Sequence, residues 1–271
     1  PSRPASVPPP GGRFSADVHN LHQSVSLHNH ILTSVFSFLV ILILLFRSLL
    51  LLHSYQNSKH QIMRYYSTNS PANFVSLKEA VLKGLADDNG LYMPEVIPTL
   101  PQSFFDNMHN LSLAEIGFEV LKPYFCPDIP ETVFKGIVDD ALNFEIPLVE
   151  IESGIFTAEL FHGPTCAFKD VGGRFMARIL GHFVKDESKE INLLVATSGD
   201  TGSAVANGFY KVPGVNVFVL YPKGLVSDVQ EKQFTTLGHN ITSIEVEGTF
   251  DDCQRMVKEA FLDKKLNADF I

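Results

Sequence analysis

Two glycine-rich segments, ELFHGPTCAFKDVGGRFMA at residues 159–177 and LVATSGDTGSAVANGF at residues 194–209, decide the fold of this chain. Each segment runs from apolar residues through a turn of small residues into a stretch with helical spacing. A strand that ends in such a turn before a helix presents free backbone N–H groups at the positive end of the helix, which suits a carboxylate or a phosphate. Ligands of α/β sheets bind at these carboxyl ends of strands. The two segments therefore predict an α/β fold with an anion-binding site at its turns.

Strand-like and helix-like stretches alternate around these segments. Short apolar runs rich in Val, Ile, Leu and Phe occur at 148–151, 155–161, 191–196, 215–221 and 241–246. The helical stretches are 168–184, 201–210, 227–236 and 250–263. The apolar residues of the first of these helices predict one broad core-facing stripe: Phe168, Phe175, Met176, Ile179, Leu180 and Phe183. The alternation predicts a parallel sheet with crossover helices, and we assign residues 148–271 to this α/β region.

Residues 63–147 are predicted to form a separate, mainly helical domain. Within it, prolines and glycines divide the stretch 71–147 into several short helices. Ser-x-x-Glu and Ser-x-x-Gln boxes mark three expected helix starts along the chain: Ser76 with Glu79, Ser112 with Glu115, and Ser227 with Gln230.

Residues 1–62 differ in composition from the rest of the chain. They carry a net charge of +3, whereas the remaining residues carry −12. Their apolar segment 31–52 contains a single charge, Arg47. As a helix it would be about 33 Å long, enough to cross a bilayer core of roughly 30 Å. Two interpretations stay open for this leader: a membrane helix, or sequence read through upstream of a true start at Met63.

The overall composition argues against several classes of protein. A net charge of −9 and a pI near 5.5 disfavour nucleic acid as a partner, because phosphate binding needs clustered Lys and Arg. A hydrophobic content of 45% is too high for a disordered chain. The three cysteines have neither the number nor the spacing of a disulfide framework or a metal site. We therefore expect no metal and a reduced, cytoplasmic setting, with a membrane anchor only if the segment 31–52 is genuine.

Lys169 is the unusual residue of the first glycine-rich segment. It is flanked by apolar residues at a predicted helix start, a setting that favours a neutral, nucleophilic amine. The simpler alternative is a surface lysine whose stem packs beside Phe168 while Asp170 serves as a first-turn charge. Neither segment fits a nucleotide-binding motif, because Walker A (G-x-x-x-x-G-K-[ST]) and the dinucleotide fingerprint (G-x-G-x-x-G) are both absent.

Several motifs together closely resemble the threonine synthase family. These are FHGPTCAFKDVGGRFM, ATSGDTG and LYPKG, preceded by MRYYSTN and GLADDNGLYMPE, so the resemblance runs from Met63 to Ile271. It implies the tryptophan-synthase-β-like fold, fold type II, and pyridoxal 5'-phosphate as cofactor. It also implies the conversion of O-phospho-L-homoserine and water into L-threonine and phosphate, so the expected partner is that small-molecule substrate.

The resemblance also assigns roles to residues. Lys169 matches the lysine that forms the Schiff base with the cofactor, and it is the candidate for proton transfer at the substrate. The turn with Ser198, Gly199, Thr201 and Gly202 resembles the loop that holds the substrate α-carboxylate. Asp200 falls in the cofactor neighbourhood, where many fold type II relatives carry Asn; it also suits the N-cap of the helix expected to begin at 201.

Five further residues are weaker candidates. His162 either faces the cofactor or substrate phosphate or bonds to backbone within a turn. Arg174 either meets the substrate phosphate or is a solvated or ion-paired helix residue. Phe168 is a candidate for packing near the cofactor ring. We expect Cys166 to be a packing residue and Cys253 to lie in the core.

The chain departs from the family pattern in one respect. The family holds the cofactor phosphate with a G-N-x-G loop downstream of the lysine, and no such loop follows TSGDTG here. We therefore expect the chain to be an N-terminal part of the enzyme. Two other readings stay open: another fold type II lyase, such as a serine/threonine dehydratase or a cysteine synthase, and an inactive, membrane-anchored fragment.

Overall fold

The computed structural model describes residues 62–185, 187–188, 190–263 and 265–266. The apolar segment 31–52 lies outside the described residues, as does the rest of the leader up to residue 61. Within the described part, no helix combines the length and the apolar character that a membrane crossing requires.

The described chain begins with a small antiparallel sheet. Its strands are β1 (Tyr65–Ser67), β2 (Ser70–Val75) and β3 (Tyr92–Pro94), which lie in the order β2-β1-β3. Along the chain, helix α3 (Leu77–Lys83) lies between β2 and β3. The prediction of a mainly helical stretch from residue 71 did not include the strands β2 and β3. Strands β1 and β3 have only three residues each, too few for a visible alternation of apolar and polar residues, and β3 joins β1 through contacts distant in sequence.

Helices dominate the next stretch, as predicted. They are α4 (Gln102–Asn107), the 3₁₀ turn η1 (Met108–Asn110), α5 (Leu113–Phe125) and α6 (Glu131–Ala141). All three predicted helix starts are confirmed, because Ser76, Ser112 and Ser227 each accept a hydrogen bond from the backbone N–H three residues later.

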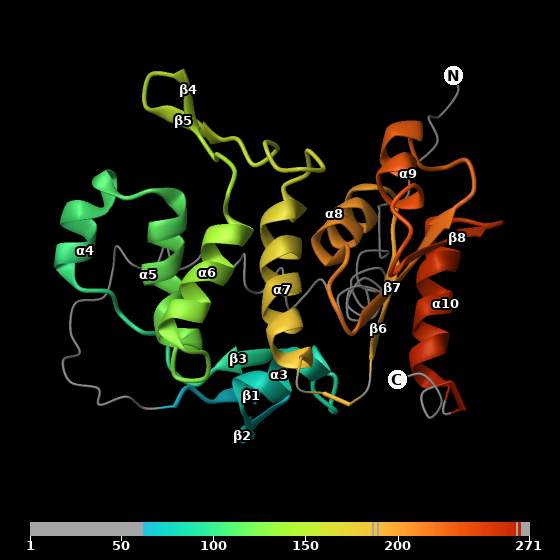
Figure 1. The fold of residues 1–271 in the computed structure, drawn as a ribbon, viewed down its shortest axis with the longest axis horizontal. Coiled ribbons are helices and arrows are strands. Elements are labelled where there is room, and N and C mark those ends of the chain that lie inside the picture. The colour runs from blue at the N-terminus through green and yellow to red at the C-terminus, as the bar shows by residue number, and fades with distance from the viewer. Residues whose placement is uncertain (1–61, 186, 189, 264, 267–271) are drawn as a thin grey trace, which may run out of the picture.

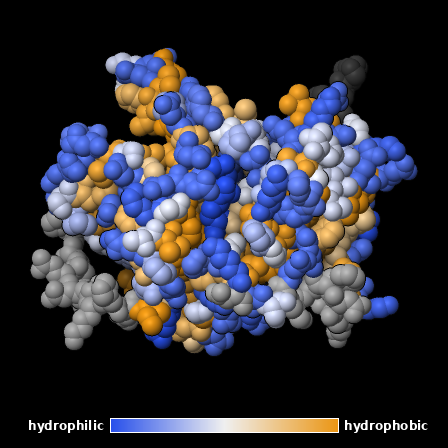
Figure 2. All heavy atoms as spheres, in the orientation of Figure 1, coloured by the Kyte–Doolittle hydropathy of each residue, from blue (hydrophilic) through white to orange (hydrophobic). Residues whose placement is uncertain are grey.

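A hairpin separates the helical stretch from the parallel sheet. Strands β4 (Leu148–Glu152) and β5 (Ile155–Ala158) pair antiparallel, and the second is shorter than the predicted run to 161. Every residue of both strands is exposed, and the hairpin projects from the top of the molecule with apolar side chains at its surface (Figures 1 and 2).

The parallel sheet and its crossover helices are confirmed. Strands β6 (Ile191–Ala196), β7 (Val215–Pro222) and β8 (Ile241–Val246) lie side by side in that order, all parallel. Helices α7 (Lys169–Val184), α8 (Asp200–Phe209), α9 (Asp228–Thr235) and α10 (Phe250–Leu262) alternate with them. Helices α8 and α10 cover opposite faces of the sheet (Figure 1).

Helix α7 packs into two hydrophobic cores. Ile179 and Phe183 lie in the core formed with α5 and α6, whereas Leu180 and Val184 lie in the core formed with the parallel sheet. The predicted single stripe is therefore divided between two faces. Both faces are buried because α7 stands between the helical layer and α8 (Figure 1).

Glycines allow α7 and α8 to approach each other closely. A Cβ atom at Gly208 would lie 2.8 Å from the backbone oxygen of Gly173, and a Cβ atom at Gly173 would lie 3.1 Å from the backbone oxygen of Ala204. Both obstacles are backbone atoms, which cannot rotate away. The helix that begins at Lys169 and the helix that begins at Asp200 are thus held against each other.

We expect Gly208→Ala to lower the free energy of unfolding by about 1–3 kcal/mol, because the added methyl group forces the two helices apart. Urea denaturation of the full chain measures this. The matched control is Gly136→Ala in α6, where a Cβ atom meets nothing within 4 Å. That variant should gain about 0.5–1 kcal/mol from helix propensity. Equal effects at the two positions would contradict the close-contact argument.

Candidate active site

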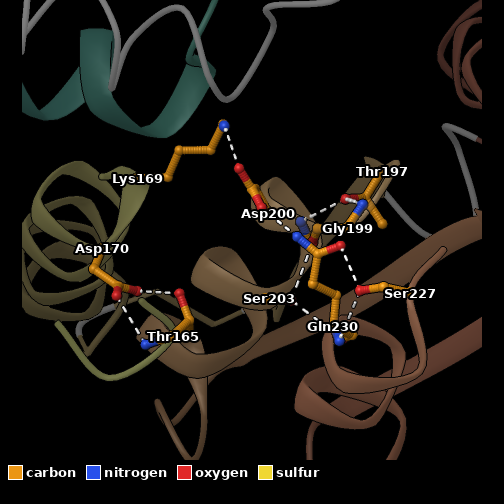
Figure 3. A network of polar contacts seen from close by, with 10 residues as sticks. Thr165, Lys169, Asp170, Thr197, Gly199, Asp200, Ser203, Ser227 and Gln230 are labelled. Atoms are coloured by element: carbon orange, nitrogen blue, oxygen red, sulfur yellow. Dashed lines mark hydrogen bonds and ion pairs between the residues drawn. The ribbon is translucent and has the colours of Figure 1, made fainter. Parts of the chain in front are cut away.

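Lys169 is the first residue of α7, and its amine faces the first turn of α8. Its side chain is 19% exposed, and its Nζ lies 3.5 Å from the Oδ2 of Asp200. The same Nζ lies 4.3 Å from the centre of the Phe168 ring. The amine is therefore largely withdrawn from water but remains open toward the second glycine-rich turn (Figure 3).

The turn before Lys169 is fixed by Asp170. The Oδ2 of Asp170 accepts from the backbone N–H of Thr165 at 2.8 Å, and its Oδ1 accepts from the Thr165 hydroxyl at 2.6 Å. Asp170 is fully buried, so these bonds satisfy a carboxylate that would otherwise be costly to bury. Asp170 therefore turns away from the Lys169 amine and serves to shape the loop (Figure 3).

The second turn is organised by Thr197, at the end of β6. Its fully buried Oγ1 accepts from the backbone N–H of Gly199 at 2.9 Å and from that of Gly202 at 2.8 Å. These two N–H groups are thus used within the protein. The first turn of α8 still presents the N–H groups of Asp200 and Thr201 for a ligand, beside the exposed side chain of Ser198.

Asp200 joins the lysine to a third element, α9. Its Oδ2 faces Lys169, while its Oδ1 accepts a hydrogen bond from the side-chain amide of Gln230. The expectation that Asp200 is the N-cap of α8 is wrong, because the cap position is occupied by Gly199 and Asp200 is the first helical residue. Its carboxylate consequently points outward to the lysine (Figure 3).

The sequence interpretation missed several residues of this site. Thr197, Thr165 and Gln230 carry its hydrogen bonds. Thr165 and Thr197 lie inside the two glycine-rich segments, but the sequence interpretation assigns them no role, and Gln230 lies outside both segments. Gln230 appeared only as part of a helix-start box with Ser227. Its contact with Asp200 spans 30 residues, so spacing along the chain gives no signal for it.

Two weaker candidates bind protein groups. The Nε2 of His162 lies 2.7 Å from the Oε2 of Glu159, so its partner is a side chain and not the turn backbone. Arg174 donates to the backbone oxygens of Asp140 and Ala141 and to Asn143. Burial lowers the pKa of Arg174, and its role is to hold the end of α6.

The two candidate cysteines, Cys166 and Cys253, have opposite environments. Cys253 is fully buried, as expected, and burial raises the pKa of its thiol. Cys166 is exposed in a turn with a positive φ of 58°, so its interpretation as a packing residue is wrong.

No cluster of three or more His, Cys, Asp or Glu suited to a metal occurs in the part of the chain that the structure describes.

Comparison with known proteins identifies the relatives of this chain. Residues 64–142 match the family described as threonine synthase N terminus. The threonine synthases of Escherichia coli and Haemophilus influenzae are 42% and 44% identical over 204 residues, which is 75% of this chain and 47% of each relative. The matched part of the chain is homologous to the threonine synthases.

Solved structures agree with this relationship. The PLP-bound threonine synthase from Brucella melitensis aligns with a TM-score of 0.71 at 37% identity, over 75% of this chain and 45% of that one. The yeast threonine synthase aligns with a TM-score of 0.70 at 37% identity, over 78% of this chain and 45% of that one. The expected fold type II architecture is therefore confirmed. The chain spans about half the length of the threonine synthases it matches.

Thr197→Val tests the hydrogen bonds that shape the second turn. Valine keeps the shape of the side chain but leaves two backbone N–H groups without their acceptor, so we expect the free energy of unfolding to fall by about 2–4 kcal/mol. Thr197→Ser keeps the hydroxyl and should lose only about 1 kcal/mol for the missing methyl group. Urea denaturation of both variants decides the question, and equal losses would contradict the role of the hydroxyl.

Proposed function

We propose that this chain carries the cofactor-binding lysine and the substrate-carboxylate turn of a threonine synthase. The reaction is the conversion of O-phospho-L-homoserine and water into L-threonine and phosphate, by a carbon–oxygen lyase acting on a phosphate ester. The observation that carries the proposal is the position of Lys169. Its sheltered amine faces the first turn of α8, with Nζ 3.5 Å from the Oδ2 of Asp200. The chain that carries it is homologous to threonine synthases.

The residues around Lys169 fit pyridoxal phosphate. The amine is sheltered by the Phe168 ring yet open toward the turn at residues 198–202. Such a setting leaves the amine within reach of a carbonyl group held at that turn. Asp200 lies within reach of the amine and therefore in the cofactor neighbourhood, as its resemblance to the family implies.

The chain's own groups divide the work of the reaction. When bound, the cofactor accepts the electrons released at the substrate Cα. The Lys169 amine, freed once the substrate amine takes its place, removes the Cα proton and then a Cβ proton as phosphate leaves Cγ. A proton is returned to Cγ, the hydroxyl of water adds at Cβ, and Cα regains its proton. The hydroxyls of Ser198 and Thr201, with the backbone N–H groups of the α8 first turn, hold the substrate carboxylate.

Gly199 and Gly202 have a structural part in this scheme. Their N–H groups donate to Thr197, so they shape the turn and leave the binding to their neighbours. A Cβ atom at Gly202 would lie 2.5 Å from the Cγ2 of Thr197, so Gly202 also permits the close packing of the turn. We propose a cytoplasmic setting, in line with the acidic composition of residues 63–271.

Reductive trapping tests the proposal. We expect pyridoxal phosphate followed by borohydride to leave a stable adduct on Lys169 of the full chain, located by peptide mass spectrometry. Lys169→Ala should lose that adduct completely and should form no threonine from O-phospho-L-homoserine. Serine and threonine, offered in parallel, test the dehydratase alternative.

Lys223→Ala is the matched control, because Lys223 is exposed, lies outside both glycine-rich turns and pairs with Glu245 and Glu247. It should trap the cofactor as the parent chain does. Folded protein with no adduct on Lys169, or with adduct spread evenly over its lysines, would contradict the proposal.

A further inference from the structure

Helix α9 reaches both glycine-rich turns through side chains on one face. Gln230 donates through Nε2 to the Oδ1 of Asp200 in the second turn. Gln233, three residues later on the same helix, donates through Nε2 to the backbone oxygen of Thr165 in the first turn at 3.2 Å. The proposed mechanism uses neither glutamine.

The orientation of the Gln230 amide is fixed by its own helix cap. The Ser227 hydroxyl donates to Oε1 of Gln230 at 2.9 Å, so the opposite end of the amide, Nε2, points toward Asp200 (Figure 3). The Ser203 hydroxyl lies 3.0 Å from the backbone oxygen of Gly199 and 3.2 Å from that of Gln230, and thereby joins the turn to α9.

Gly199 makes room for this amide. A Cβ atom at Gly199 would lie 2.3 Å from Oε1 of Gln230 and 2.6 Å from its Cδ. The φ of Gly199, +139°, is also a conformation that L side chains rarely adopt. The turn is therefore built to accept the Gln230 side chain directly against its backbone.

We propose that Gln230 is a positioning residue that holds the Asp200 carboxylate beside the Lys169 amine without letting the two close into a tight ion pair. The Nζ–Oδ2 distance of 3.5 Å is longer than the ~2.7–2.9 Å of a charge-assisted hydrogen bond. Gln230 competes with the lysine for the same carboxylate. The inference rests on the proposed function of Lys169 for its meaning in catalysis.

Removal of the amide gives a directional prediction. In Gln230→Ala, Asp200 loses its neutral donor and moves onto the ammonium group of Lys169. The amine is then held in a closer ion pair and is less available to an acylating reagent. We expect its acetylation by acetic anhydride to slow by about threefold, the scale of a partly exposed ion pair.

Competitive labelling measures this without cofactor. The full chain is treated with a trace of acetic anhydride, and peptide mass spectrometry compares Lys169 with the exposed Lys223 as internal reference. Gln230→Glu keeps the size of the side chain and its bond from Ser227 but adds an anion, so it should also slow labelling. A rate for Lys169 within about 1.5-fold of the parent chain in both variants would overturn the inference.

A double-mutant cycle separates positioning from a general structural effect. In the background of Asp200→Ala, Gln230→Ala should leave the labelling of Lys169 unchanged, because the group it positions is gone. An equal slowing in both backgrounds would overturn the inference. The matched control is Gln102→Ala, which removes an amide that donates to Asp106 at 3.0 Å on an exposed helix face; the rate at Lys169 should not change.

The outcome is independent of the trapping experiment. If the cofactor is trapped on Lys169 but the Gln230 variants acetylate Lys169 at the parent rate, the positioning role of Gln230 is contradicted and the proposed function is not. A labelling effect with no trapped cofactor on Lys169 would uphold the Gln230–Asp200–Lys169 coupling and sink the proposed function.

Discussion

The burial of α7 on two sides is the constraint on which the rest of the structure depends. One face of the helix completes the core of the N-terminal helices, and the other completes the core of the parallel sheet. A helix held on both faces has little freedom to slide or rotate, because close-packed cores resist displacement. Its first residue, Lys169, is therefore delivered to a fixed position, although the loop before it is exposed in part.

Polar contacts transmit this fixed position to the neighbouring helices. Arg178 of α7 donates to the side chain of Asp140 in α6 at 2.6 Å and to the backbone oxygen of Gly208 in α8 at 2.7 Å. The arginine thus crosses between both neighbours, close to the glycine contact where α7 and α8 meet. The starts of α7 and α8, which carry Lys169 and Asp200, are consequently set relative to each other by packing and hydrogen bonds far from the reacting groups.

Sequence reasoning predicted the parts of this molecule that local patterns encode. The strand–helix alternation after residue 190, the helix caps and the helix that starts near Lys169 all lie in contiguous stretches with their own spacing. The β1–β3 sheet was missed because β1 and β3 are short and pair across more than 20 residues. The same reason explains why Gln230 escaped notice as a site residue. A contact made by tertiary packing leaves no pattern along the chain, whereas the motif AFKD is a contiguous pattern that can be read directly.

The Gln230 side-chain amide donates a hydrogen bond to the Asp200 carboxylate, which has no donor of its own. An asparagine at position 200 would bring its own N–H groups to the site, whereas the aspartate of this chain brings none. An ionised aspartate only accepts, and the half-exposed carboxylate of Asp200 takes its hydrogen bonds from water and from protein donors. With Lys169 as its only protein donor, the carboxylate would close onto the ammonium group in a tight ion pair. The Gln230 amide of α9 supplies a second donor without adding charge. The hydrogen bond from the Ser227 hydroxyl to Oε1 fixes the amide so that Nε2 faces Asp200. Gln230 therefore binds the carboxylate oxygen that does not face Lys169, and it competes with the lysine for the carboxylate.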